Sequence, residues 1–121
     1  MVYAAADKLN KVLRVDFCGI VTDAEAQKAI ADIQQVLREL PRGFRLLTDF
    51  SGLEQMDAAC APAIKCIMDM CNDNGVELIV RVIPDPHKDI GFTIMSLFHY
   101  RHDLRIVTCD TTAEAEKLLA V

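Results

Sequence analysis

Apolar and polar residues alternate along parts of this chain with the spacing of strands. Between Lys11 and Cys18 every second residue is apolar, which predicts a strand with one solvated face. Residues 44–48 are a short apolar run bounded by turn residues, so we expect a strand covered on both faces. Residues 76–83 have the strongest strand pattern in the chain. A last strand is expected over 104–109, and residues 2–6 are a candidate hairpin partner for the first strand.

Segments with the residue spacing of helices lie between these strands. Thr22 with Glu25, and Thr111 with Glu114, have the spacing of a capping box, in which each side chain satisfies a free backbone donor at the helix start. The first helix should end before Pro41, with a core stripe of Ala26, Ile30, Ile33, Leu37 and Leu40. The last should turn Ala115, Leu118 and Leu119 inward, and further helices are expected after residue 57 and over 87–99.

The start of the second helix depends on Pro62, which has no N–H to donate. If Asp57 is the N-cap, the first turn should be slightly distorted. If Ala61 is the cap, Pro62 occupies the favoured first position, but the cap is poor. Both starts remain open at this point.

Strands that alternate with helices require a mainly parallel sheet with right-handed crossovers. We therefore predict an α/β fold with a mixed, mainly parallel sheet of 4–5 strands and about four helices. The length of 121 residues fits a single domain over 1–121.

Composition narrows the classes of function. Apolar residues make up 52% of the chain but never form a run long enough for a membrane span, and the net charge of -5 disfavours nucleic acid. The N-terminus lacks a signal-peptide pattern, so we expect a cytoplasmic protein. Five cysteines without a C-x-x-C pair are expected to be reduced and mostly buried.

The most informative segment is LLTDFSGLEQMDAAC, in which a strand is followed by a polar loop over 49–57 and a helix. Together with the NDNG turn and the strand VELIVRV, it resembles the STAS domain family (sulfate transporter and anti-sigma factor antagonist), in particular its SpoIIAA-like stand-alone members. The family pattern is D-x-S at the strand end, then D-S-S-G at the helix start. Asp49, Ser51 and Asp57 match it.

The resemblance implies a regulatory module that binds a protein partner, for example an anti-sigma kinase or another signalling protein. In the family, the second serine of D-S-S-G is phosphorylated, and the phosphate breaks the partner complex. This chain has Ala58 and Ala59 at the two serines and Cys60 at the glycine. A methyl group cannot accept a phosphate, so that switch is not expected here. Ser51 is an alternative acceptor, although a serine in such a turn more often bonds its own backbone.

We therefore predict a non-catalytic surface that binds its partner through shape and charge. Its residues are the polar loop and the start of the next helix: Ser51, Glu54, Gln55, Met56, Asp57, Ala59 and Cys60.

Three chemical alternatives are weaker. Asp49, Glu54 and Asp57 resemble acid–base carboxylates, but no histidine or lysine of the segment accompanies them. The thiol of Cys60 would have a lowered pKa if it lay in a first helical turn, although no cation is near. The pair His99 and His102 fits a helix end better than a metal site. We predict no catalytic residue, no metal and no cofactor.

A second surface is predicted on the helix over 87–99. Phe92, Met95 and His99 lie outside its core stripe, so this helix has more apolar surface than one core face needs. A homodimer face and a lipid pocket both fit. The alternative function is thus binding of a small apolar ligand or a nucleotide, as in SEC14-like lipid-exchange domains.

Overall fold

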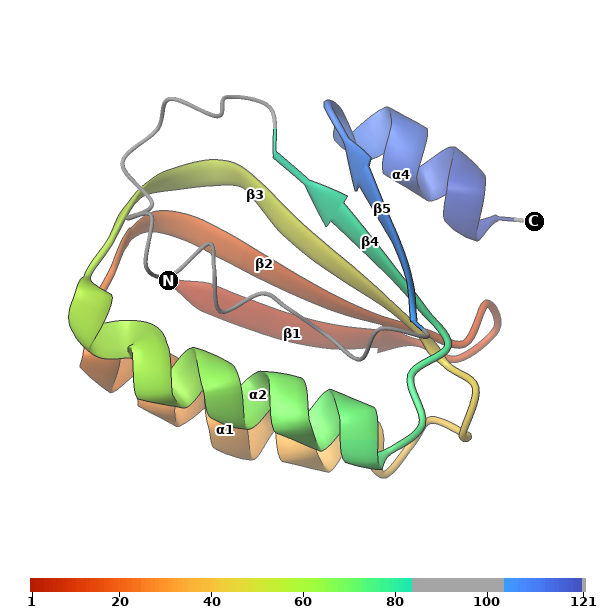
Figure 1. Ribbon diagram of the computed structural model, residues 1–121, viewed down its shortest axis with the longest axis horizontal. Helices are drawn as coiled ribbons and strands as arrows, with labels where there is room; N and C mark the ends of the chain where they lie inside the picture. The colour runs from red at the N-terminus through yellow and green to blue at the C-terminus, as the bar shows by residue number, and fades with distance from the viewer. Residues whose placement is uncertain (84–103, 121) are drawn as a thin grey trace.

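The computed structural model describes residues 1–83 and 104–120, which form a five-stranded sheet with helices on both faces (Figure 1). The sheet has the order β1-β2-β3-β4-β5, in which β1 is antiparallel to β2 and every other pair is parallel. This confirms the predicted α/β fold with a mixed, mainly parallel sheet. The helix predicted over 87–99 lies outside the described residues.

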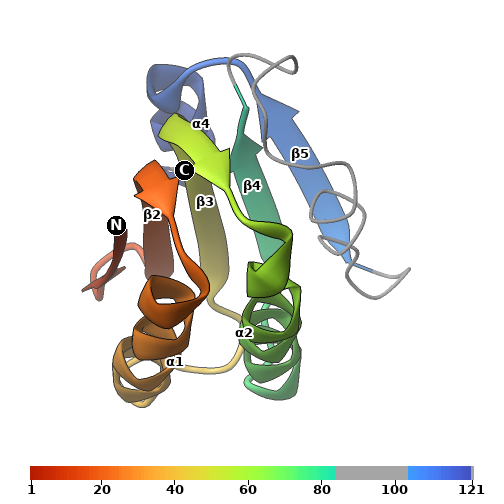
Figure 2. The ribbon, with the colours of Figure 1, turned by 90° about the vertical axis from the view of Figure 1, so that its left-hand side faces the viewer.

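The described elements follow the predicted order. They are β1 (Val2–Asp7), β2 (Val12–Val21), α1 (Asp23–Leu37), β3 (Arg45–Met56), the 3-10 turn η1 (Ala58–Cys60), α2 (Ala61–Asp73), β4 (Leu78–Val82), β5 (Arg105–Cys109) and α4 (Thr112–Leu119). Helices α1 and α2 lie side by side on one face of the sheet, and α4 covers the other (Figures 1 and 2).

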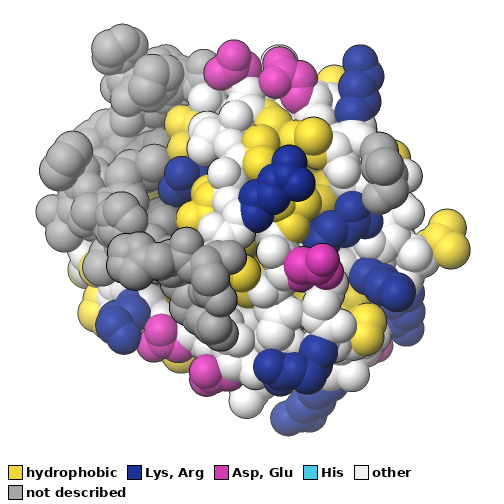
Figure 3. Space-filling model, turned by 45° about the vertical axis from the view of Figure 1, so that its right-hand side comes forward, with side chains coloured by type: hydrophobic (Ala, Val, Ile, Leu, Met, Phe, Trp, Pro, Cys, Tyr) yellow, Lys and Arg dark blue, Asp and Glu magenta, His cyan; other side chains and the backbone are white. Residues whose placement is uncertain are grey.

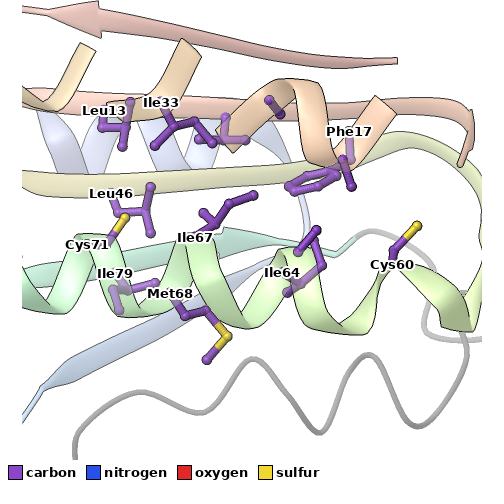
Figure 4. Close-up of a cluster of buried hydrophobic side chains, with 14 of the residues drawn as sticks. Leu13, Phe17, Ile33, Leu46, Cys60, Ile64, Ile67, Met68, Cys71 and Ile79 are labelled. Atoms are coloured by element: carbon purple, nitrogen blue, oxygen red, sulfur yellow. The ribbon is translucent and has the colours of Figure 1, made fainter. Parts of the chain in front are cut away.

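Each face of the sheet has its own apolar core because successive strand residues point to opposite faces. Leu13 and Leu46 face α1 and α2, whereas Val12 and Leu47 face α4. Figure 4 shows the larger core, in which Phe17 lies above Ile64 of α2. Strand β3 is therefore covered on both faces, as its apolar run predicts.

The helix caps follow the predicted residues only in part. The hydroxyls of Thr22 and Thr111 accept hydrogen bonds from the N–H groups of Glu25 and Glu114, at 3.3 and 3.2 Å. The Glu25 carboxylate does not complete its capping box, because it binds the amino group of Met1 at 2.7 Å.

The ends of two helices differ from the prediction. Helix α1 stops at Leu37, and residues 38–40 continue it with tighter bonds to carbonyls three residues earlier. In α4, Leu118 is 40% exposed, so its predicted inward position is wrong, whereas Ala115 and Leu119 are buried as predicted.

Strand β3 differs most from the prediction. We expected it to end at Thr48 and to be followed by a polar loop, but it continues to Met56. Phe50 is buried and stacks on Phe17, with ring centroids 5.0 Å apart, and Leu53 is also buried. Burial of these side chains outweighs the loop character of the polar residues between them.

Replacement of Phe50 tests whether this segment belongs to the core. Phe50→Ala removes a buried ring and should lower the free energy of unfolding by about 3–5 kcal/mol. Gln55→Ala, at an exposed position of the same strand, should change it by less than about 0.5 kcal/mol. Guanidinium denaturation of the two variants makes the comparison. Equal and small changes would mean that 50–56 is the loop that the sequence pattern suggests.

Candidate interaction surface at the end of strand β3

The end of β3 extends beyond the rest of the sheet. Its pairing with β4 stops at Asp49 opposite Val82, whereas its pairing with β2 continues to Met56 opposite Val21. Residues 50–56 therefore form a two-stranded extension with the end of β2. We call this extension, with η1 and the exposed side chains around it, the β3-end surface.

Two bulges determine which side chains of the extension are exposed. The register shifts between Asp16 and Cys18 of β2, and again between Gly19 and Ile20, and each shift places an extra residue in β3. The residues that point inward are consequently three apart: Phe50, Leu53 and Met56. Between them Ser51, Gly52, Glu54 and Gln55 are exposed.

Two predicted surface residues are not accessible. Met56 is 3% exposed and Cys60 is 0% exposed, so both predictions of a surface position are wrong. Met56 is turned inward by the second bulge, and the Cys60 thiol packs against the end of β2, 3.6 Å from the carbonyl oxygen of Val21. Both side chains lie beneath the surface that we expected them to form.

Asp57 has the capping role that the sequence suggests, but the helix starts in two stages. Its carboxylate accepts a hydrogen bond from the N–H of Ala59 at 3.0 Å, which caps η1. Helix α2 then begins at Ala61, with Pro62 near its start and no side-chain bond at its N-cap. Both proposed starts are thus partly correct. Ala58 and Ala59 are exposed on η1.

Ile20 is a surface residue that the sequence interpretation missed. It pairs with Gln55 across the extension and is 58% exposed. The alternation of this strand places Ile20 on the solvated face. It was not predicted as a surface residue because its side chain is apolar. The described surface therefore has an aliphatic side chain at the same end of the sheet as the exposed alanines and acids.

Acidic side chains surround the buried thiol at this end of the molecule. Burial raises the pKa of Cys60, and the charges of Asp23, Asp57 and Glu25 raise it further. The predicted lowering of its pKa is therefore wrong. Because Asp57 is exposed and Asp23 is half-buried, the same charges give the β3-end surface a negative potential.

Asp49 lies on the opposite face of the sheet from this acidic group. Its carboxylate accepts hydrogen bonds from Arg14 at 3.2 Å, from the Thr112 hydroxyl at 3.1 Å and from the N–H of Ser51 at 2.8 Å. Asp49 and Asp57 thus have separate structural partners. The acid–base trio suggested for Asp49, Glu54 and Asp57 has no support in this arrangement.

Arg14 holds several acids together around Asp49. It also binds Asp16 at 3.0 Å and Glu116 of α4 at 3.4 Å. Burial alone would lower the pKa of Arg14, but the hydrogen bond to Asp16 and the charges of Asp16 and Asp49 raise it. Arg14 and Asp49 therefore tie α4 to the strand from which the β3-end surface extends.

Several predictions fall on residues that the structure does not describe. Phe92, Met95 and His99, the homodimer or lipid-binding face suggested for them, and the histidine pair lie within 84–103. Among the described residues, no group of three or more His, Cys, Asp or Glu side chains could hold a metal ion. No helix in the described ranges is long and apolar enough to cross a membrane.

Comparison of the sequence with protein families and with curated proteins gives no match. Solved structures do match. The anti-sigma factor antagonist SpoIIAA in its unphosphorylated form superposes over the whole of both chains, with a TM-score of 0.67 and 12% identity. An uncharacterized DUF3478-family protein with a SpoIIAA-like fold from Shewanella loihica superposes over 98% of this chain and 92% of that one, with a TM-score of 0.65 and 10% identity.

A third structure is similar over a smaller part. Mglu matches 73% of this chain and 20% of its own length, with a TM-score of 0.53 and 10% identity.

The chain therefore has an α/β fold of the STAS type. More particularly, the fold of the described residues is SpoIIAA-like.

The buried position of Cys60 predicts low reactivity. At pH 7, iodoacetamide should modify Cys60 of the native protein far more slowly than the half-buried Cys66, because burial hinders access and the raised pKa suppresses the thiolate. Cys71, whose pKa burial raises to about 12, should be equally slow. Peptide mass spectrometry after timed quenching gives the rates. Fast modification of Cys60 would restore the reactive-thiolate hypothesis.

Proposed function

We propose that this protein is a non-catalytic regulatory module that binds a protein partner through the β3-end surface. The observation that carries the proposal is Ile20, an aliphatic side chain that is 58% exposed on a strand extension reaching beyond the sheet. Because single exposed apolar side chains are common on protein surfaces, the proposal rests on Ile20 together with the exposed Ala58 and Ala59 at the same end of the sheet. The SpoIIAA-like fold supports the proposal, since SpoIIAA is an anti-sigma factor antagonist.

The chemistry of the surface indicates the kind of partner. Glu54 and Asp57 are exposed on either side of Gln55, the register partner of Ile20, and of Met56, and Asp23 adds charge at the start of α1. A complementary partner would present an apolar pocket for Ile20 surrounded by lysine or arginine side chains. A regulatory kinase of the anti-sigma type is one candidate class, and the protein would meet it in the cytoplasm.

The proposed mode of regulation excludes phosphorylation on η1. The exposed side chains there are the methyl groups of Ala58 and Ala59, which have no hydroxyl to accept a phosphate. A partner held at this surface would therefore not be released by modification of η1. Its release would depend on concentration, on competition for the same surface, or on modification elsewhere on it, for example at the exposed Ser51.

The thiol and carboxylate groups near the end of β3 also favour binding over catalysis. The Cys60 thiol is buried with a raised pKa, and the Asp49 carboxylate is occupied by Arg14, Thr112 and Ser51. Asp57 caps η1. Each group thus has a structural role that needs no substrate.

Photo-crosslinking tests the proposal. A crosslinking amino acid in place of Ala59 should capture, in extracts of the host organism, a protein that the same amino acid in place of Ala113 does not capture. Ala113 is a matched control because it is also an exposed alanine, on α4 at the opposite face of the sheet. Capture of the same proteins from both positions would contradict a specific surface at Ala59.

Affinity for the captured partner then tests the chemistry of the surface. Ile20→Ser should weaken binding about tenfold, and Ala59→Arg should weaken it more, by steric clash and by repulsion from a basic partner. Leu118→Ser and Ala113→Arg are the corresponding controls. Calorimetry gives the dissociation constants, and circular dichroism verifies the folds. Unchanged affinity in both surface variants would refute the assignment.

A further inference from the structure

Strand β1 forms one edge of the sheet and lacks the usual protection of an edge. It pairs with β2 on one side, and no other described strand pairs with its outer side. Its sequence, VYAAAD, has no proline or lysine, and its pairing with β2 has no bulge. Exposed edges commonly carry such features because they prevent pairing with another strand.

The hydrogen-bond pattern with β2 shows which backbone groups of β1 point outward. Met1 and Cys18 exchange both of their backbone bonds, at 2.6 and 2.8 Å. In an antiparallel ladder such pairs alternate with pairs that make no bonds to each other. Tyr3 and Ala5 therefore bond to β2, and the N–H and C=O groups of Val2, Ala4 and Ala6 point away from the sheet.

These outward groups are self-complementary. If a second β1 lies antiparallel to the first, with the two-fold axis at Ala4, then Ala4 faces Ala4 of the other copy and Val2 faces its Ala6. Every outward N–H then meets an outward C=O, so no backbone group of this edge is left unpaired. An axis between Ala4 and Ala5 would instead oppose outward groups to residues whose backbone groups already bond to β2. An axis at Ala5 would pair Ala4 with Ala6 but would set Val2 opposite Lys8, which lies outside β1.

The side chains fit the same arrangement. Tyr3, which is 50% exposed, would lie opposite the small Ala5 of the other copy on the face that carries α4. On the other face Val2 and Ala4 already pack partly on the core, and their small side chains leave room for a close neighbour. The one bulky side chain, Tyr3, thus faces a small one, and no charged side chain lies between Val2 and Ala6 to oppose pairing.

Helix α1 runs beside the same edge of the sheet. Glu25 lies beside Met1, and Glu39 lies 3.8 Å from Lys8, so the middle of the helix, near Asp32, lies level with Ala4. A groove of about 260 Å³ runs along this edge and is lined by Lys28 and Asp32, both exposed. In the two-fold arrangement the two α1 helices are antiparallel, one on each side of the seam.

We propose that β1 is a dimerisation edge, through which two copies of this chain join their sheets by antiparallel pairing of β1 about Ala4. The residues involved are separate from the β3-end surface, so this inference does not depend on the proposed function. A copy paired in this way would still expose Ile20 and Ala59.

Sedimentation at protein concentrations up to about 1 mM tests the proposal. The wild-type protein should reach twice its monomer mass of 13.5 kDa. Ala4→Pro should remain a monomer, because it removes an outward N–H that the monomer does not use. Ala5→Lys, which places a charge at the seam opposite Tyr3, should also remain a monomer. If Ala4→Pro does not fold, the mass of Ala5→Lys alone tests the proposal. Ala113→Lys, a control on α4, should dimerise as the wild type does.

Amide exchange measured by NMR tests the register. The N–H groups of Val2, Ala4 and Ala6 should exchange at least about tenfold more slowly in concentrated than in dilute wild-type protein, and those of Tyr3 and Ala5 should change much less. A wild-type protein that stays monomeric would overturn the proposal. So would a dimer that persists in both edge variants, or one that leaves the exchange of Ala4 unchanged.

Discussion

Strands β2 and β3 pair along almost their whole lengths, and the other described elements are arranged around this pairing. The register from Val12 opposite Arg45 to Val21 opposite Met56 brings the ends of both strands to the same place. Helix α1 and η1, which follow the two strands, must then begin side by side. The contact of Cys60 with the carbonyl of Val21 is a direct result.

The bulges in this pairing convert a core strand into a surface. Before Asp49, β3 alternates in the ordinary way and is covered on both faces. After it, each extra residue resets the alternation, so that one side chain in three is buried and the two between are exposed. Phe50, Leu53 and Met56 therefore fix the backbone on which Glu54 and Gln55 are displayed. A rigid strand can display them more accurately than a loop would.

The sequence predicts the fold well because its signals are local. Alternation in β2, the caps at Thr22 and Thr111 and the stop before Pro41 each act over a few residues. The candidate site was predicted less well because its geometry is not local. Whether Met56 is buried depends on two register shifts against β2, and whether Ile20 is exposed depends on the same shifts. Neither follows from the periodicity of one strand, so a polar run read as a loop proved to be a bulged strand.

The same reasoning explains why two different kinds of contact are available on one small sheet. At the β3 end, the exposed apolar and acidic side chains, such as Ile20 and Asp57, are the groups by which we propose that a partner is recognised. At the β1 edge the side chains are small, and the unsatisfied groups belong to the backbone of Val2, Ala4 and Ala6. Backbone groups recognise another strand of any sequence, so it is the symmetry about Ala4 that favours a second copy of this chain.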